Sequence, residues 1–163
     1  PPYRPVRLAA LYERAGRTQN LNGTSGSVSV IGAVSPQGAD FSEPVTQNTK
    51  RFVRCFLALD KALAYARHYP AINWNTSYSE YYEDLDPYYE EHVGKDFPTL
   101  RGRLLTLLNE ETRLQEIVRP IGSDVLPDGQ KLTLEMGPVV RTGFLQHNAS
   151  PKDDTFVPLD KQL

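Results

Sequence analysis

The chain has 163 residues, which is enough for one ordinary domain or for two small pieces that share a boundary. Hydrophobic residues make up 39% of the sequence and charged residues 23%, as in soluble globular proteins with a packed core. The net charge of −2 comes from interspersed acids and bases, so the chain lacks the clustered Lys and Arg of proteins that bind nucleic acid or anionic membranes. The sequence contains no apolar run of the roughly 20 residues that a membrane span needs, and no signal-peptide pattern at its start.

The first third of the sequence has the pattern of an α/β protein. Apolar residues at helical spacing predict a helix over residues 6–17, and a polar stretch over 18–25 predicts a loop. Residues 27–34 alternate and then become almost wholly apolar, which is typical of a strand covered on both faces in a parallel sheet. A loop over 35–47, rich in proline and glycine, follows the strand. Open α/β sheets bind ligands at this position.

One apolar stripe predicts a second helix after this loop. The stripe consists of Phe52, Phe56, Leu59 and Leu63, and Thr46 or Asn48 could cap the helix. The helix should end near residues 68–70, because the residue before a proline is disfavoured in helical geometry.

The single cysteine lies within this stripe. Cys55 cannot form an internal disulfide, and its apolar neighbours predict a buried, unreactive thiol. A reducing, cytoplasmic setting fits this composition.

Beyond Trp74 the sequence predicts helices only. An acidic stretch rich in tyrosine is followed by an amphipathic helix over residues 100–118, which Pro120 and Gly122 should end. A third helical stretch runs from about 127 to 148, and Gly137–Pro138 should kink or split it. We therefore predict an α/β part over residues 1–75 followed by an all-α part over residues 76–163.

The residues offer little catalytic chemistry of their own. The sequence has no glycine-rich loop followed by Lys and Ser or Thr, and His68, His92 and His147 lack metal-ligand spacing. The paired acids Glu90–Glu91 and Glu110–Glu111 are expected on solvated helix faces. The sequence thus predicts neither a catalytic residue nor a metal site.

Tyr69 is the residue with the clearest potential as a ligand contact. It precedes Pro70 at a rigid corner, where its ring could stack on a planar base. Packing against the end of the preceding helix would use the same ring and stays open as an alternative.

Four longer strings in the sequence are distinctive: Gly26–Pro36 with Asp40–Gln47, His68–Trp74 with Ser77–Ser79, Leu11–Arg17 and, more weakly, Phe144–Ala149. Together they resemble a known family, the catalytic A subunits of V/A-type rotary ATPases. The resemblance covers essentially the whole chain, and by resemblance Ser42–Thr46 and Asn73–Trp74 argue against the non-catalytic B subunit and the F-type catalytic subunit.

The resemblance implies the remnant of a RecA-like nucleotide-binding domain followed by a helical-bundle domain. It also implies that the phosphate loop, the Mg-holding residues and the catalytic carboxylate lie outside this chain, so that the chain alone would not turn over ATP. The full subunit would bind ATP or ADP with Mg and alternate with B subunits in a hexameric ring. This ring would contact a central rotor stalk at the cytoplasmic face of a membrane and drive the ion-translocating sector indirectly.

The resemblance also assigns roles to individual residues. Tyr69 and Pro70 match the aromatic wall of the adenine pocket, which the family usually builds with Phe. The other side of the base matches Gln146, Asn148, Ala149 and Ser150, although the family tends to place an aromatic at the position of Ser150. The tip between two helices matches the contact with the rotor stalk: Ser123, Asp124, Val125, Leu126, Pro127 and Asp128.

Gly137–Pro138 is a second departure from the family, whose helix normally runs through this point. A free-standing helical interaction module without a nucleotide role remains as the alternative function. A glycine-rich loop ending in Gly-Lys-Thr upstream in the parent gene would distinguish a subunit of the ATPase from such a module.

Overall fold

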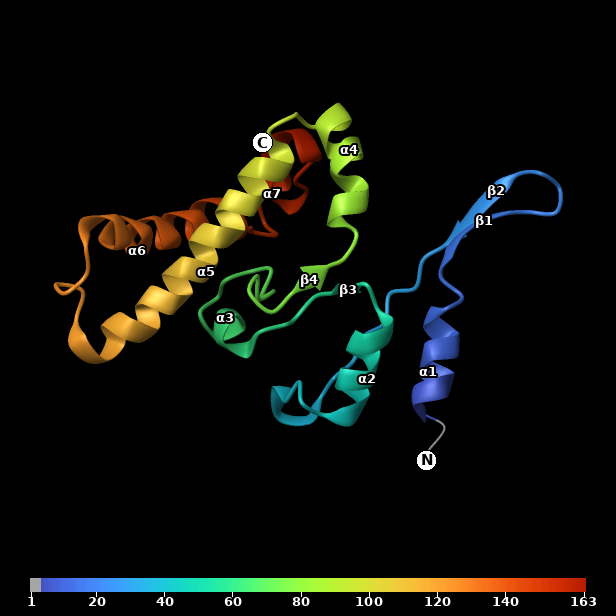
Figure 1. Ribbon diagram of the computed structural model, residues 1–163, viewed down its shortest axis with the longest axis horizontal. Helices are drawn as coiled ribbons and strands as arrows, with labels where there is room; N and C mark the ends of the chain where they lie inside the picture. The colour runs from blue at the N-terminus through green and yellow to red at the C-terminus, as the bar shows by residue number, and fades with distance from the viewer. Residues whose placement is uncertain (1–3) are drawn as a thin grey trace. The chain divides into compact units, whose positions relative to one another are not determined.

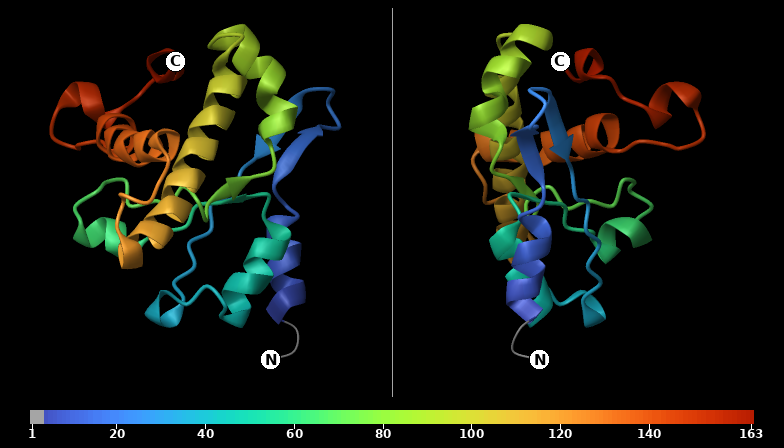
Figure 2. Two further views of the ribbon diagram at one scale, coloured as in Figure 1. Left: turned by 60° about the vertical axis from the view of Figure 1, so that its left-hand side comes forward. Right: turned by 90° about the vertical axis from the view of Figure 1, so that its right-hand side faces the viewer.

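The computed structural model describes residues 4–163 and divides them into two compact units, with the boundary between Phe56 and Leu57. Figure 1 labels the elements of each unit, and Figure 2 shows them from two further directions.

The first unit combines two packed helices with a β-hairpin. Helix α1 (Arg4–Tyr12) packs against α2 (Pro44–Phe52), and strands β1 (Gly16–Gln19) and β2 (Ser25–Val28) pair antiparallel, with Gly16 opposite Val28. A short 3-10 turn, η1 (Gln37–Ala39), precedes α2, and β3 (Cys55–Phe56) ends the unit.

The predicted buried parallel strand over residues 27–34 is wrong. Strand β2 ends at Val28, and β1 occupies part of the predicted loop over residues 18–25. A turn closes the hairpin, in which the Asn20 side chain donates a hydrogen bond to Thr24 Oγ1 at 3.0 Å and Gly23 adopts φ 84°. The four residues of β1 are exposed, so the hairpin is not covered on both faces within this chain.

The predicted helix over the stripe from Phe52 to Leu63 is also wrong. Helix α2 begins earlier, because the Glu43 carboxylate accepts a hydrogen bond from the Thr46 amide at 3.1 Å and Pro44 follows at the first helical position. It ends at Phe52, and the predicted caps Thr46 and Asn48 lie inside it. Cys55, in β3, is exposed, so the prediction of a buried thiol is wrong.

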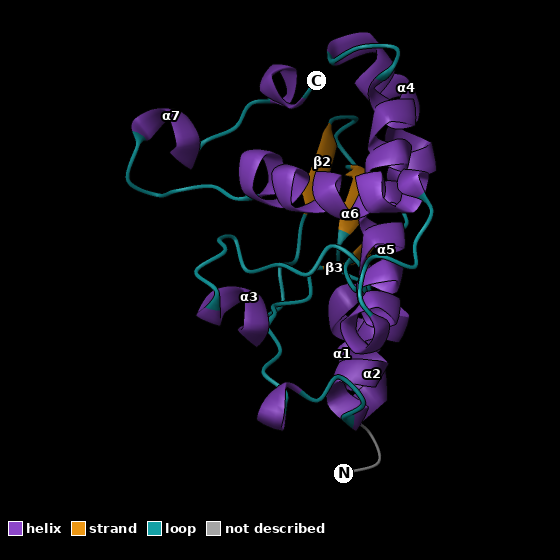
Figure 3. Ribbon diagram, turned by 90° about the vertical axis from the view of Figure 1, so that its left-hand side faces the viewer, coloured by secondary structure: helices purple, strands orange, loops and turns teal. Residues whose placement is uncertain are grey.

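The second unit is mostly helical, as Figure 3 shows. The long helix α5 (Phe97–Ile121) forms its axis, and α4 (Tyr82–His92) and α6 (Asp128–Val140) both pack against it (Figure 1). The prediction of an all-α C-terminal part is confirmed by this arrangement. The remaining elements are α3 (Lys61–Tyr65), β4 (Tyr78–Ser79), the π-helical turn η2 (Arg141–Leu145), α7 (Lys152–Thr155) and the 3-10 turn η3 (Leu159–Gln162).

The core of this unit gathers around α5. Leu108 and Leu114 are almost fully buried, as are Ala58 and Phe97. The helix continues one residue past Pro120, which was expected to end it, and stops before Gly122, whose φ of 85° suits glycine.

Gly137–Pro138 was predicted to kink or split the helix, and the structure shows that α6 is not split there. A residue before a proline is disfavoured in a helix because its Cβ and amide crowd the proline ring, and Gly137 has no Cβ. Gly137 is also buried, and a Cβ there would lie less than 3.0 Å from three side-chain atoms of Glu111. The regular α-helix changes only at Arg141, where η2 begins, and the helical stretch ends at Leu145 rather than at Asn148.

Candidate functional site

The structure brings together the two segments that the sequence assigned to opposite sides of a base. The His147 amide donates a hydrogen bond to the Tyr69 carbonyl at 2.7 Å, although 78 positions separate these residues in the numbering. Both segments belong to the second unit. Tyr69 is 52% exposed, and its hydroxyl donates a hydrogen bond to the Ala64 carbonyl at 3.4 Å.

The turn that carries Tyr69 is held by a capped helix. The Asp60 carboxylate accepts a hydrogen bond from the Ala62 amide at 2.7 Å at the start of α3, and another from the Asn73 side chain at 2.8 Å. These bonds join the two sides of the turn. The hydrogen bond from Asn73, supported by those from the α3 amides, holds the pKa of Asp60 below its ordinary value.

The second segment is held by Asp154, which sequence reasoning missed. One carboxylate oxygen lies 2.9 Å from Nδ1 of His147, and the other accepts a hydrogen bond from the Asn148 amide at 2.5 Å. The hydrogen bond with His147, more than that from Asn148, lowers the pKa of Asp154. Thr155 adds a hydrogen bond from its hydroxyl to the Ala149 carbonyl at 3.2 Å. The sequence shows only that an acidic residue lies seven positions after His147, and this spacing is too common to predict the contact between Asp154 and His147.

His68 packs behind this site as a largely buried ring. It is 7% exposed and contacts Trp74 edge to face, with 5.6 Å between ring centroids. Burial, reinforced by the positive charge of Arg141 and by His147, lowers the pKa of His68. His68 is therefore a neutral packing residue at pH 7.

The metal-binding capacity of the described residues is limited. Among the side chains that the structure describes, no group of three His, Cys, Asp or Glu could hold a metal ion. Mg²⁺ in nucleotide sites is usually held by one or two carboxylates together with substrate phosphates, which is a smaller set of protein ligands than such a group.

The tip between α5 and α6 contains the residues assigned to a stalk contact. Val125 is 61% exposed, whereas Leu126 is 8% exposed and anchors the tip in the helical core. The Leu126 amide donates to the Ser123 carbonyl at 3.2 Å, which closes a short turn before α6 begins at Asp128.

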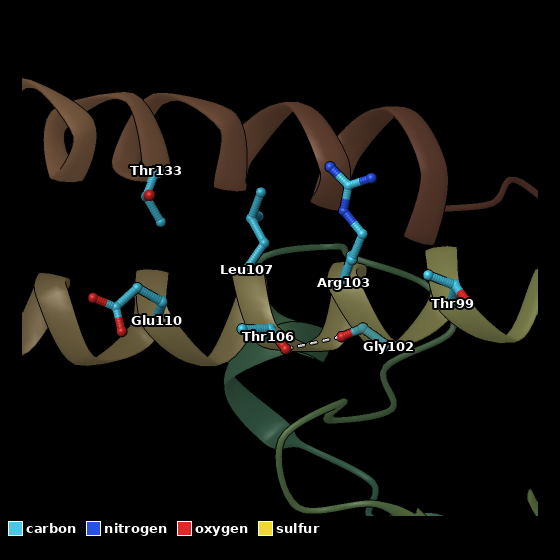
Figure 4. A pocket seen from close by; sticks show the side chains of 7 residues that line it. All are labelled: Thr99, Gly102, Arg103, Thr106, Leu107, Glu110 and Thr133. Carbon is cyan, nitrogen blue, oxygen red and sulfur yellow. Dashed lines mark hydrogen bonds between the residues drawn. The ribbon is translucent and has the colours of Figure 1, made fainter. Parts of the chain in front are cut away.

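Two open pockets lie elsewhere, and the residues proposed for the base line neither of them. One has a volume of about 540 Å³ and lies between α5 and α6 (Figure 4), where the Thr106 hydroxyl donates to the Gly102 carbonyl at 2.9 Å. The other, of about 610 Å³, lies in the first unit between α1, residues 32–37 and α2, and so borders the loop over residues 35–47 that was expected to lie near a ligand.

Comparisons with known proteins match two successive parts of the chain, with a boundary later in the sequence than the one between the compact units. Residues 1–79 match the model of the ATP synthase alpha/beta family nucleotide-binding domain, and residues 86–163 match that of the C-terminal domain of V and A type ATP synthase. A solved structure of an ATP synthase subunit from Nanoarcheaum equitans shares the fold, with a TM-score of 0.81 at 21% identity over 99% of this chain and 37% of its own.

Curated relatives are considerably more similar in sequence. The V-type ATP synthase alpha chain 2 of Clostridium tetani is 60% identical over 99% of this chain and 27% of its own length. The V-type alpha chain of Halothermothrix orenii is 58% identical, and the A subunit of the A-type ATP synthase of Natronomonas pharaonis is 55% identical, each over 99% of this chain and 28% of the relative. The chain thus spans little more than a quarter of the length of these relatives.

The fold and both family matches define the class: a nucleotide-binding-domain segment joined to the helical domain of an ATP synthase subunit. Within that class, the chain belongs to the family of V-type ATP synthase alpha chains and A-type ATP synthase A subunits, whose C-terminal region it matches. The family resemblance predicted from the sequence is confirmed. No helix among the described residues has the length and apolar character required to cross a membrane.

Proposed function

We propose that this region forms one wall of the adenine pocket and the helical arm of a catalytic A subunit in a rotary ATP synthase. The hydrogen bond from His147 to Tyr69 is the observation that carries the proposal, because it joins two segments that were assigned separately to the same base. The full subunit would hydrolyse or synthesise ATP, coupled to proton or sodium transport.

The exposed face of Tyr69 supplies the stacking surface. Stacking of a base on an aromatic ring contributes about 1–3 kcal/mol and tolerates any base. The polar side chains of Gln146 and Asn148 are suited to the edge of the base, and Pro70, Ala149 and Ser150 complete the surroundings. Ser150 offers a hydroxyl group instead of the aromatic ring that the family favours.

The phosphates and Mg²⁺ would be bound by other parts of the subunit. Phosphate binding in such enzymes needs oriented N–H donors, a phosphate loop and a bound metal ion, and the sequence contains no phosphate loop. We therefore expect the isolated chain to be inactive. The domain boundary would lie near residues 75–76, between the nucleotide-binding remnant and the helical arm.

The helical arm would transmit nucleotide-dependent movement to the rotor. Residues 123–128 would contact the central stalk, with Leu126 fixing the tip and its exposed neighbours providing the contact. The subunit would alternate with B subunits in a hexameric ring at the cytoplasmic face of the membrane. Nucleotide would bias a rigid-body swing of the arm only as far as its contacts differ between the open and closed states.

A free-standing helical interaction module is the weaker candidate. The similarity to alpha chains and A subunits extends over 99% of the chain at 55–60% identity, and so spans both Tyr69 and the segment that follows η2. This favours a part of the nucleotide-binding subunit over an independent module.

The decisive experiment compares ATP and tripolyphosphate binding to the full-length A subunit with Tyr69→Ala and Tyr69→Phe. Tyr69→Ala should weaken ATP binding roughly 5- to 150-fold through lost stacking, and leave tripolyphosphate binding unchanged because that probe has no base. Tyr69→Phe keeps the aromatic face and should bind ATP as the native protein does. ATP affinity that is unaffected by Tyr69→Ala would refute the adenine role.

A further inference from the structure

A buried acidic residue on α5 has no role in the site described above. Glu111 is 1% exposed, so its expected place on a solvated helix face is wrong. Its Oε1 accepts hydrogen bonds from Arg141 Nη1, in a salt bridge, and from Gln115 Nε2 at 2.6 Å. The neighbouring Glu110 makes the exposed ion pair with Arg113 that a solvated helix face predicts.

Such a buried pair needs a reason other than stability. Removing the Glu111 charge from water is costly, while the Arg141 side chain stays 24% exposed, and apolar replacements of such pairs are often as stable or more stable. A buried pair can instead select one arrangement among several that have similar energy. Here Gly137 lets α6 approach α5 closely enough to cover the Glu111 carboxylate, so the pair and the close helix contact define a single geometry.

The pair leads directly to the base segment. Arg141 is the first residue of the π-helical turn η2, and its carbonyl accepts a hydrogen bond from the Gln146 amide at 2.9 Å. The next residue, His147, donates to the Tyr69 carbonyl. Two consecutive backbone hydrogen bonds therefore connect the residue held by Glu111 to the turn that carries the aromatic wall. Turns with π-helical bonding occur often at functional sites.

We propose that Glu111 and Arg141 are positioning residues of the adenine pocket, which fix η2 on α5 and so place Gln146 and Asn148 beside the base. This inference rests on the proposed function. It adds that Glu111, on the long helix α5 of the arm, sets the geometry of the pocket through its salt bridge with Arg141.

The test uses the full-length A subunit with the double substitution Glu111→Leu and Arg141→Met, which removes the salt bridge while keeping apolar volume in its place. ATP affinity should fall about 2- to 30-fold, the range found for residues that act on a site through others. Tripolyphosphate affinity and the thermal midpoint should stay at native values. Amide hydrogen exchange at Gln146 and His147 should become faster, whereas exchange in α4 should not change.

Leu114→Ala is the matched control, because Leu114 is 0% exposed, lies one turn from Glu111 on α5 and leaves the salt bridge intact. It should lower the thermal midpoint and keep native ATP affinity. Native ATP affinity in the double variant, or an equal loss for ATP and tripolyphosphate, would overturn the positioning role.

Arg141→Lys provides a second route if the double variant does not fold. It keeps the charge and loses the rigid guanidinium fork, so it should give a smaller loss of ATP affinity with the same faster exchange at Gln146 and His147. Native affinity and native exchange in this variant would overturn the proposal. Tyr69→Ala separates the two proposals. If it leaves ATP affinity unchanged, the adenine role itself fails. If it lowers ATP affinity while the substitutions at Glu111 and Arg141 do not, only the positioning role is rejected.

Discussion

Gly137→Ala tests how tightly α6 packs against α5. The added Cβ would lie under 3.0 Å from Cγ, Cδ and Oε1 of Glu111, a separation that real Cβ atoms essentially never show. The Glu111 side chain is 1% exposed and held by Arg141 and Gln115, so moving it aside would break these contacts.

The expected effect follows from two opposing contributions. Overpacking costs about 1–3 kcal/mol, and the upper end applies because Glu111 is held by two partners. Alanine gains about 1 kcal/mol over glycine in a helix interior. The helix pair should therefore lose about 2 kcal/mol of stability, which makes amide exchange in α5 and α6 roughly 30-fold faster where local opening controls it.

Gly102→Ala is the control for this experiment. Gly102 lies inside α5, and among the described residues beyond its own helical backbone no atom lies within 4 Å of a Cβ placed there. The same substitution should therefore stabilise the helix by about 1 kcal/mol and slow exchange. If native-state hydrogen exchange of the full-length protein shows equal protection in the two variants, the close contact between the helices is not as described.

Three further predictions concern the groups that hold the base site. The pKa of His68 is lowered in the folded state, so its neutral form stabilises the fold above pH about 6.5, and this stability is lost as the pH falls below that value. His68→Phe should therefore flatten the decrease in α5–α6 exchange protection as the pH falls below about 6.5. Asp154 has a lowered pKa, so its contacts are complete above about pH 3.9 and are lost as the pH falls through the folded-state pKa. Asp154→Asn should speed hydrogen exchange of the Asn148 amide at neutral pH without changing exchange in α5. Unchanged exchange at Asn148 would contradict the role of Asp154. Asp60→Ala removes the cap of α3 and should destabilise the Tyr69 turn by about 1 kcal/mol, seen as faster exchange at Ala62 and Leu63, whereas Asp60→Asn should retain most of the protection.

Elements with strong local signals could be predicted from the sequence. Helix α5 was predicted from its apolar spacing, and two of its apolar residues, Leu108 and Leu114, are buried as an amphipathic helix requires. The stripe from Phe52 to Leu63 gave a wrong prediction of one helix. Its helical spacing spans the end of α2, strand β3 and helix α3, which are separate elements. The cap at Asp60 was the competing signal, since its carboxylate begins a new helix at this point.

The base site was predictable only in part. Family strings led us to propose Tyr69 and the segment after Phe144 as parts of this site, but the sequence does not show that these segments share a backbone hydrogen bond. Asp154 and Glu111 could not be assigned, because each depends on a partner that only the fold brings near. Glu111 pairs with Arg141, which follows the next helix in the sequence. It also packs against Gly137, whose lack of a Cβ makes room for it, and the pattern of one helix face shows neither neighbour.

The π-helical turn has a consequence for how the sequence can change in length. Its closing bond runs from the Gln146 amide to the Arg141 carbonyl, five residues back, whereas an α-helix closes over four. Residues 141–145 therefore accommodate one residue more than an α-helical turn between two fixed anchors, the Glu111 salt bridge and the bond to Tyr69. Deleting a single residue from within 142–145 would shorten this turn to α-helical bonding and keep both anchors, whereas the same deletion within α5 would rotate every later side chain by about 100°. Homologues that lack one residue in this part of the chain should therefore retain the same anchors.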